Sequence, residues 1–331
     1  MTANATDEDD EVLGEGHVAL VTGSTDGIGA ATARNLAETG ATVVVHGRDS
    51  EKGERLVVDL PGEGHAVYTA DFARLDDVRA LADAVLSEFD RLDVLVNNAG
   101  TWQGERRLVD LPGSTEGVEM TFAVNHLSPF LLTNLLADRL AETGERRADG
   151  SSGGDSTTEA GPARVVTVSS DLHRRATLDV EAVRGPTGPS GVAAYSLSKL
   201  ANVLFTVELG ERLPASVTAT CCHPGVSPST GLSRDGSTVA GLGWKLFGVV
   251  GDLFGVTDST DESAATQTYL ATSPEVTGVT GEYFDDCERT APSDAATDRD
   301  AARRLWRASA KWTDLGDESA VGAVESRSAD S

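Results

Sequence analysis

The chain has 331 residues, of which 39% are hydrophobic and 24% are charged, and its mean hydropathy is −0.19. No stretch reaches the roughly 18–20 uninterrupted apolar residues of a membrane-spanning helix, so we expect no membrane span. Lys and Arg number 27 against 53 Asp and Glu, which gives a net charge of −26. This charge disfavours a nucleic-acid partner, because phosphate contacts need basic surface.

Three cysteines exclude a disulfide scaffold, and their spacing, with Cys221 next to Cys222 and Cys287 far away, matches no metal site. The N-terminus carries no basic or apolar signal-sequence region, so we expect a cytoplasmic protein. The acid-rich composition with only four lysines indicates a halophilic protein, whose charge repulsion is screened by high cytoplasmic salt.

Hydrophobic patterning predicts strands that alternate with helices along the chain. The expected strands are 17–22, 41–45, 66–69, 92–96, 164–168 and 216–221, and the expected helices are 30–38, 75–89, 119–140 (which Pro129 could break) and 193–213. This alternation is typical of βαβ units. We therefore predict an α/β protein with a doubly wound parallel sheet and helices on both of its faces.

Composition also predicts the domain boundaries. One domain over 17–315 is expected between a disordered acidic tail (1–16) and a disordered polar tail (316–331). The Gly-, Ser- and acid-rich stretch 143–162 is expected to be a disordered insertion. An apolar, glycine-containing stretch within 231–260 is interpreted as a lid over an apolar substrate pocket, with a core-packing helix as the alternative.

A glycine-rich turn follows the first predicted strand and opens a helix. Gly23, Ser24, Gly27, Ile28 and Gly29 lie in this turn. Glycines here permit a tight turn and a close backbone approach, and the helix N-terminus supplies N–H donors. We expect this turn to bind the pyrophosphate of a dinucleotide.

The charge at the end of the second strand indicates which dinucleotide is used. An acid there would bind the ribose 2′-hydroxyl of NAD, but Arg48 is the first charged residue and could bind the 2′-phosphate of NADP. Asp26 would oppose that phosphate. We predict NADP as the preferred cofactor and leave NAD open.

Three further motifs suggest proton transfer. Tyr195 and Lys199 are four residues apart and hence on one face of a helix. A neighbouring ammonium would lower the tyrosine pKa and make it a usable acid and base. The stretch 97–100 (NNAG) closes the fourth strand, and Ser169 and Ser170 close the fifth.

Together, in this order, these motifs resemble the short-chain dehydrogenase/reductase family over about residues 17–315. Within the family the chain is most similar to the retinol-dehydrogenase-like branch. The matching stretches are 47–54, 119–127, 130–136, 195–205 and, most distinctively, 281–287 (GEYFDDC).

The resemblance implies a Rossmann-type fold and assigns roles to the catalytic residues. Tyr195 would be the general acid and base, and Lys199 would lower its pKa and hold the nicotinamide ribose. Ser170, rather than Ser169, would hydrogen-bond the substrate oxygen. Asn125 would hold a water that links Lys199 to solvent.

The resemblance also implies further contacts with the cofactor. The expected residues are Asp71 and Phe72 at the adenine, Asn98, Ala99 and Gly100 on the ribose and nicotinamide side, and Pro224, Gly225 and Val226 facing the nicotinamide. A threonine usually follows this last motif directly. Here it is displaced to Thr230, which leaves the hydroxyl contact undetermined.

The predicted activity is hydride transfer between a nicotinamide and a small, lipophilic carbonyl or alcohol substrate. A homodimer could form through helices 119–140 and 193–213, with leucines 131, 132, 135 and 136 serving either that interface or the core. The alternatives are a non-catalytic nucleotide sensor or partner-binding protein, and another reaction on this fold, such as reduction of an activated double bond.

Overall fold

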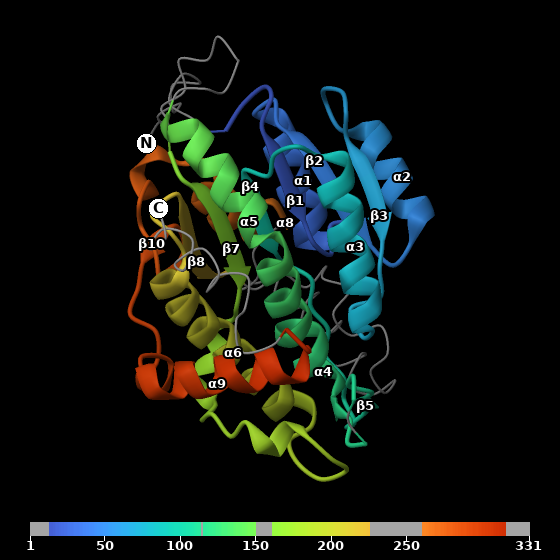
Figure 1. Cartoon of the computed structure of the whole chain (residues 1–331), viewed down its shortest axis with the longest axis vertical. Helices are drawn as coiled ribbons and strands as arrows, with labels where there is room; N and C mark the ends of the chain where they lie inside the picture. Colours follow the sequence, from blue (N-terminus) through green and yellow to red (C-terminus); the bar gives the residue numbers. More distant parts are fainter. Residues whose placement is uncertain (1–12, 114, 150–160, 226–259, 316–331) are drawn as a thin grey trace, which may run out of the picture.

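The computed structural model of the chain describes residues 13–113, 115–149, 161–225 and 260–315 (Figure 1). Eight strands form one sheet in the order β10-β9-β8-β7-β4-β1-β2-β3, parallel except for β10. They are β1 (Val18–Val21), β2 (Thr42–Gly47), β3 (Ala66–Thr69), β4 (Val94–Asn97), β7 (Ala163–Val168), β8 (Val217–His223), β9 (Glu282–Asp285) and β10 (Glu288–Arg289). A two-stranded ribbon joins β5 (Leu108–Val109) to β6 (Val118–Glu119).

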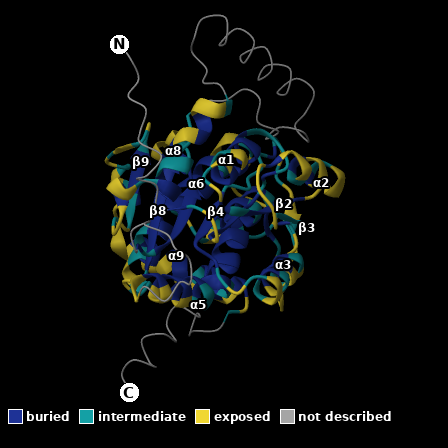
Figure 2. Cartoon of the chain, turned by 90° about the horizontal axis from the view of Figure 1, so that it is seen from above, coloured by how far each residue is buried: buried dark blue, intermediate teal, exposed yellow. Residues whose placement is uncertain are grey.

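Helices cover both faces of the sheet (Figure 2). One face carries α1 (Gly27–Glu38), α2 (Ser50–Asp59) and α8 (Thr260–Thr272), and the other carries α3 (Leu75–Glu88), α5 (Ser128–Ala148) and α6 (Gly191–Arg212). Within β1, Ala19 and Val21 pack toward the first set, and Val18 and Leu20 toward the second. Both faces are buried, so the strand is continuously apolar rather than alternating. The predicted single-domain, doubly wound α/β fold is confirmed.

Three helices were not predicted. Asp49 and Asp298 cap the N-termini of α2 and α9 (Arg299–Trp312) by accepting the N–H groups of Lys52 and Ala301. These capping signals are present in the sequence, but the flanking apolar residues are too few to stand out. The third is α8, which presents small side chains to α1 and therefore has no apolar stripe.

The long helix predicted at 119–140 consists of three parts. A short α4 (Met120–Phe122) runs into a π-helical turn, Ala123–Leu127, and α5 follows from Ser128. Pro129 does not break the helix, because it lies in the first turn of α5, where its missing N–H has no intrahelical partner to lose.

The boundaries predicted for two disordered segments were wrong. α5 continues to Ala148, so the insertion cannot begin at 143. Thr143 is buried, and its hydroxyl accepts the N–H of Leu92 at 3.0 Å. At the N-terminus, Leu13 is 2% exposed and belongs to the core, so the ordered chain begins before residue 17. Residues 1–12, 150–160 and 316–331 lie outside the described residues.

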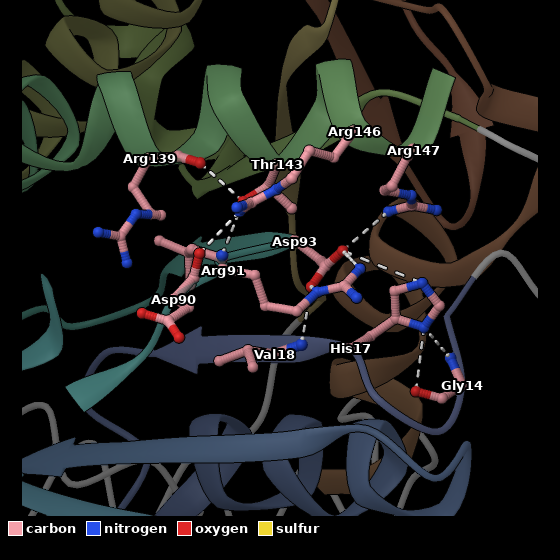
Figure 3. Close-up of polar contacts among 11 residues, drawn as sticks. Gly14, His17, Val18, Asp90, Arg91, Asp93, Arg139, Thr143, Arg146 and Arg147 are labelled. Carbon is pink, nitrogen blue, oxygen red and sulfur yellow. Dashed lines mark hydrogen bonds and ion pairs between the residues drawn. The ribbon is translucent and has the colours of Figure 1, made fainter. Parts of the chain in front are cut away.

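α5 also supplies one side of a buried ionic cluster (Figure 3). Asp93, fully buried just before β4, accepts two hydrogen bonds from Arg91 at 2.6 and 2.8 Å and one from the Val18 N–H at 2.8 Å. Arg147 adds a contact at 3.4 Å and His17 one at 4.0 Å. The cluster joins α5 to the starts of β1 and β4, at the amino ends of the parallel strands.

Helix α9 lies across the outer side of α6, as Figure 1 shows in red. Its Trp306 ring stacks on Phe205 of α6 at 5.8 Å and meets Phe130 of α5 edge-on at 4.9 Å. Leucines 131, 132 and 136 are fully buried within the chain, and Leu135 packs against the same core. These leucines therefore serve the core, which was one of the two predicted alternatives.

Candidate active site

A cleft of about 1180 Å³ opens at the carboxyl ends of the parallel strands. Fifteen of the predicted site residues line it: Gly23, Gly27, Ile28, Gly29, Arg48, Asp71, Phe72, Asn98, Ala99, Gly100, Ser170, Tyr195, Lys199, Pro224 and Gly225. The volume exceeds the roughly 300–1,000 Å³ of an ordinary small-molecule pocket. It is large enough for a dinucleotide and a substrate together.

The glycine-rich turn has the geometry expected of a phosphate cradle. Gly23 has φ +66°, and a Cβ there would lie 2.8 Å from Ala99 Cα. A Cβ on Gly29 would lie 2.4 Å from Gly23 O, so neither position admits a side chain. The turn leads directly into α1, whose first-turn N–H groups at Ile28 and Gly29 have no intrahelical partner. These donors line the cleft and suit a pyrophosphate.

Ser24 does not line the cleft, contrary to the prediction. Its hydroxyl donates to Val21 O at 2.7 Å and accepts the His46 N–H at 3.1 Å. The side chain is fully buried and ties β1 to β2. Thr25, the next residue, faces the cleft in its place.

His46 was not predicted but supports both the turn and the adenine side. Its Nδ1 accepts the Gly23 N–H at 3.2 Å, so Nε2 carries the proton and donates to Ala70 O at 3.2 Å. Burial lowers its pKa to about 4, which keeps the ring neutral and this tautomer in place. The ring stacks on Phe72 at 4.4 Å. The only sequence signal was its position at the end of the second strand.

The charges at the end of β2 are arranged differently from the expectation. Asp26 caps α1 through the Gly27 N–H at 2.9 Å and forms an ion pair with Lys52 of α2 at 2.8 Å. Asp49 caps α2. Arg48 is exposed, lines the cleft and makes no ion pair with any described residue. Asp26, the acid expected to oppose a 2′-phosphate, is therefore paired with Lys52, which the sequence analysis did not consider.

Tyr195 and Lys199 lie on one face of α6, at the inner end of the cleft. Burial raises the pKa of Tyr195 to about 12, and its hydrogen bond with Ser170 offsets this in part. Lys199 Nζ lies 5.5 Å from the tyrosine ring centre and donates to Val168 O at 2.9 Å. Burial lowers the pKa of Lys199 to about 8. Burial is the largest cause of both shifts, and the lowering of the tyrosine pKa by Lys199 stays a prediction.

The two strand-end serines face different ways. Ser169 is buried, and its hydroxyl donates to Lys199 O at 2.8 Å. Ser170 lines the cleft beside Tyr195 and accepts the Leu172 N–H at 3.3 Å, which caps a 3₁₀ turn, Asp171–Arg175. The ring of His173 donates from Nδ1 to Ser170 O at 2.8 Å, and its Nε2 accepts the Ser293 N–H at 3.1 Å. This arrangement favours Ser170 as the substrate-facing hydroxyl.

Asn125 lies in the π-helical turn, behind the cleft wall rather than on it. Its Oδ1 accepts the Thr101 N–H at 2.7 Å, and its Nδ2 donates to Thr101 O and Ser198 Oγ, both at 3.0 Å. A Cβ added to Gly100 would lie 3.5 Å from Asn125 Oδ1 and 3.7 Å from Lys199 Nζ, so both groups lie close to Gly100. π-helical turns are frequent at functional sites. The relay role of Asn125 stays a prediction.

Asn98 connects the two halves of the site. Its Nδ2 donates to Thr22 O at 2.8 Å and to Gly23 O at 3.2 Å, which holds the glycine-rich turn of β1 against the end of β4. Asp71 keeps its own loop in place, since its Oδ1 accepts the Ala73 N–H at 3.0 Å. Val226 and the predicted lid lie outside the described residues, apart from Thr260 in α8.

The part of the cleft outside the predicted cofactor contacts, called the substrate side below, was missed by motif reasoning, because it is built from residues without a motif. They include Trp102, Gln103, Arg107, Met120, Val124, Leu172, Arg175 and Val192. Over the described part of the chain, no cluster of three His, Cys, Asp or Glu side chains could hold a metal ion. Nor is any helix in that part long and apolar enough to cross a bilayer.

Comparison with known proteins identifies relatives over nearly the whole chain. A family model described as short chain dehydrogenase matches residues 17–151. Human retinol dehydrogenase 13 is 37% identical over 311 residues, which are 91% of this chain and 85% of the relative.

Solved structures share the fold. The 3-ketoacyl-(acyl-carrier-protein) reductase from Brucella melitensis complexed with NADH has a TM-score of 0.59 and 27% identity, covering 82% of this chain and 96% of that one. The Pseudomonas aeruginosa RhlG/NADP active-site complex has a TM-score of 0.60 and 26% identity, covering 83% and 96%.

Proposed function

The chain belongs to the short-chain dehydrogenase/reductase family and is an NAD(P)-dependent oxidoreductase, and we propose that it uses NADP to interconvert a lipophilic carbonyl compound and its alcohol. The observation that carries this proposal is the single cleft that holds both the glycine-rich turn and the Ser170–Tyr195–Lys199 group. The cleft fits a dinucleotide, which would lie from Arg48 and Phe72 at one end to Tyr195 and Lys199 at the other.

A bound nicotinamide supplies or accepts the hydride, and the chain handles the proton. With a pKa of about 12, Tyr195 is protonated at neutral pH and is ready to donate its phenolic proton to a carbonyl oxygen. Ser170 hydrogen-bonds Tyr195 and would donate to the same oxygen as negative charge develops there. The Lys199 ammonium lies 5.5 Å from the centre of the tyrosine ring. Its positive charge would stabilise the negative phenolate that forms when Tyr195 gives up its proton.

The NADP preference rests on Arg48. Its guanidinium is exposed in the cleft wall, whereas Asp26 is neutralised by Lys52 and Asp49 is engaged as a helix cap. Arginine binds phosphate through two parallel N–H groups, which suits a ribose 2′-phosphate.

Fluorescence titration with NADPH and NADH in molar KCl tests this preference. We expect tighter binding of NADPH, and Arg48→Gln should weaken NADPH binding about tenfold while leaving NADH binding unchanged. Arg55→Gln, an exposed arginine of α2 outside the cleft, is the matched control. Equal affinities for both cofactors in the wild type would refute the NADP preference.

Turnover of a panel of lipophilic aldehydes and ketones tests the reaction. Tyr195→Phe should retain cofactor binding and lose reduction by at least about 100-fold. Cofactor binding without turnover of any carbonyl compound would instead support the non-catalytic alternative.

We further propose that the protein works in a salt-rich cytoplasm. The net charge of −26 and the three unpaired cysteines support this proposal. Activity that survives in molar KCl and is lost reversibly after dialysis into low salt is the expected result, and full activity at low salt would contradict it.

A further inference from the structure

The substrate side of the cleft carries two arginines that the reaction itself does not use. Arg107 precedes β5, and Arg175 ends the 3₁₀ turn that begins after Ser170. Both line the cleft and both are exposed. Neither guanidinium forms an ion pair or a hydrogen bond with any described residue, whereas arginines 74, 91, 174, 184 and 212 all pair with acids.

Exposed arginines 34, 55 and 307 also form no ion pair with a described residue. What distinguishes Arg107 and Arg175 from these three is their position in the cleft lining. Five acids also line the cleft: Asp26, Asp49, Asp71, Asp171 and Asp285. Asp26 pairs with Lys52 and Asp171 with Arg174, and none of the five pairs with Arg107 or Arg175. The site therefore keeps two guanidinium groups available beside the reaction centre.

Apolar side chains line the cleft together with these arginines. Met120 and Val124 lie on the Arg107 side, where the Met120 N–H donates to Arg107 O at 2.8 Å. Leu172 lies on the Arg175 side, and Val192, 49% exposed, projects from the start of α6, one turn before Tyr195. A ligand that fits this surface has an apolar body and an anionic group.

We propose that the substrate is an amphipathic carbonyl compound that carries a carboxylate, which Arg107 and Arg175 bind while its carbonyl group faces Tyr195. Guanidinium groups form paired hydrogen bonds with oxyanions, carboxylates among them. This inference rests on the proposed carbonyl reductase activity and specifies its substrate class.

The test compares 4-carboxybenzaldehyde with its uncharged methyl ester as substrates, with NADPH in molar KCl. We expect the wild type to reduce the acid with a kcat/KM about tenfold higher than that of the ester. Arg107→Gln and Arg175→Gln should each remove most of this preference by raising KM for the acid, and should leave the ester unchanged. Arg307→Gln, an exposed arginine of α9 outside the cleft, is the matched control.

Other outcomes separate the two proposals. Equal kcat/KM values for acid and ester, or equal losses on both in the variants, would overturn the carboxylate inference and leave the reductase activity intact. Weaker NADPH binding in the arginine variants would also overturn it, by assigning these residues to the cofactor. Failure to reduce either compound, or any of the wider carbonyl panel, would refute the proposed function.

Binding without turnover provides the independent readout. Displacement titrations monitored by NADPH fluorescence would compare 4-methylbenzoate with the uncharged 4-methylbenzamide on the enzyme–NADPH complex. Tighter binding of the benzoate, lost in both arginine variants, supports the carboxylate site even where neither aldehyde is reduced. Equal binding of the two ligands refutes it.

Discussion

Replacement of Lys199 by methionine should make the cofactor-free protein more stable and inactive. Lys199 is 3% exposed, and its ammonium group has no carboxylate partner among the described residues. Burial lowers its pKa from 10.5 to about 8, so holding it charged at neutral pH destabilises the folded state. Methionine has a similar length and leaves Val168 O satisfied, because Asn202 Nδ2 donates to that oxygen at 3.1 Å.

The magnitude follows from the two pKa values. At about 1.4 kcal/mol per pKa unit, a fall from 10.5 to about 8 corresponds to about 3 kcal/mol. Between pH 8 and 10.5 the unfolded wild-type chain holds a proton that the folded chain has lost. The wild type therefore gains stability relative to the variant as the pH rises through this window. The variant's advantage should be complete below pH 8 and absent above 10.5.

Denaturant unfolding of both proteins at pH 7 and pH 10.5, at constant KCl, measures this difference. Lys311→Met, an exposed lysine of α9, should show no pH-dependent gain and is the control. Carbonyl reduction by Lys199→Met should fall at least about 100-fold. A variant that is less stable than the wild type at pH 7, or a difference that does not change with pH, would refute the reasoning.

Three further predictions concern the scaffold. Asp93→Asn should lower the free energy of unfolding by about 3–5 kcal/mol, because it removes the buried carboxylate that Arg91 and the buried Arg147 contact, while Asp90→Asn at the exposed neighbour should be silent; equal effects in denaturant unfolding would contradict this. Trp306→Ala should lower the free energy of unfolding by about 3–5 kcal/mol, because the ring packs on Phe205 and Phe130. Since α9 covers the outer face of α6 that the predicted dimer would use, light scattering should find a wild-type monomer, and a stable dimer through that face would contradict this. His173→Phe should lower kcat more than it changes KM, because the His173 ring positions Ser170 through its hydrogen bond to Ser170 O. An unchanged kcat in steady-state assays would show that Ser170 is positioned without this hydrogen bond.

Local sequence patterns were sufficient for six of the eight strands of the sheet and for the two ends of the cleft, but not for β9 and β10. The glycine-rich turn must contain glycine at positions 23 and 29, because contacts with neighbouring backbone exclude a Cβ. The four-residue spacing of Tyr195 and Lys199 places them on one helix face whatever surrounds them. Such requirements act over a few residues and can be read along the chain.

Contacts between distant segments could not be read in this way. Ser24 stands within the turn motif, but pairing of β1 with β2 points its hydroxyl to Val21 O and His46 N–H. Thr143 looks like the start of a polar loop, but its hydroxyl accepts the Leu92 N–H 51 residues away. In each case a partner remote in sequence determines the role of a polar side chain.

The sequence by itself determined six strands of the parallel sheet, the NAD(P) cofactor class and the placement of Tyr195 and Lys199 on one helix face, because strand hydrophobicity, turn glycines and helical spacing are local properties. Only the tertiary structure decided that Lys52 neutralises Asp26, that burial raises the pKa of Tyr195, and that Arg107 and Arg175 line the cleft. Charge, burial and pKa depend on which surfaces meet when the chain packs, and that is settled only by the assembled fold.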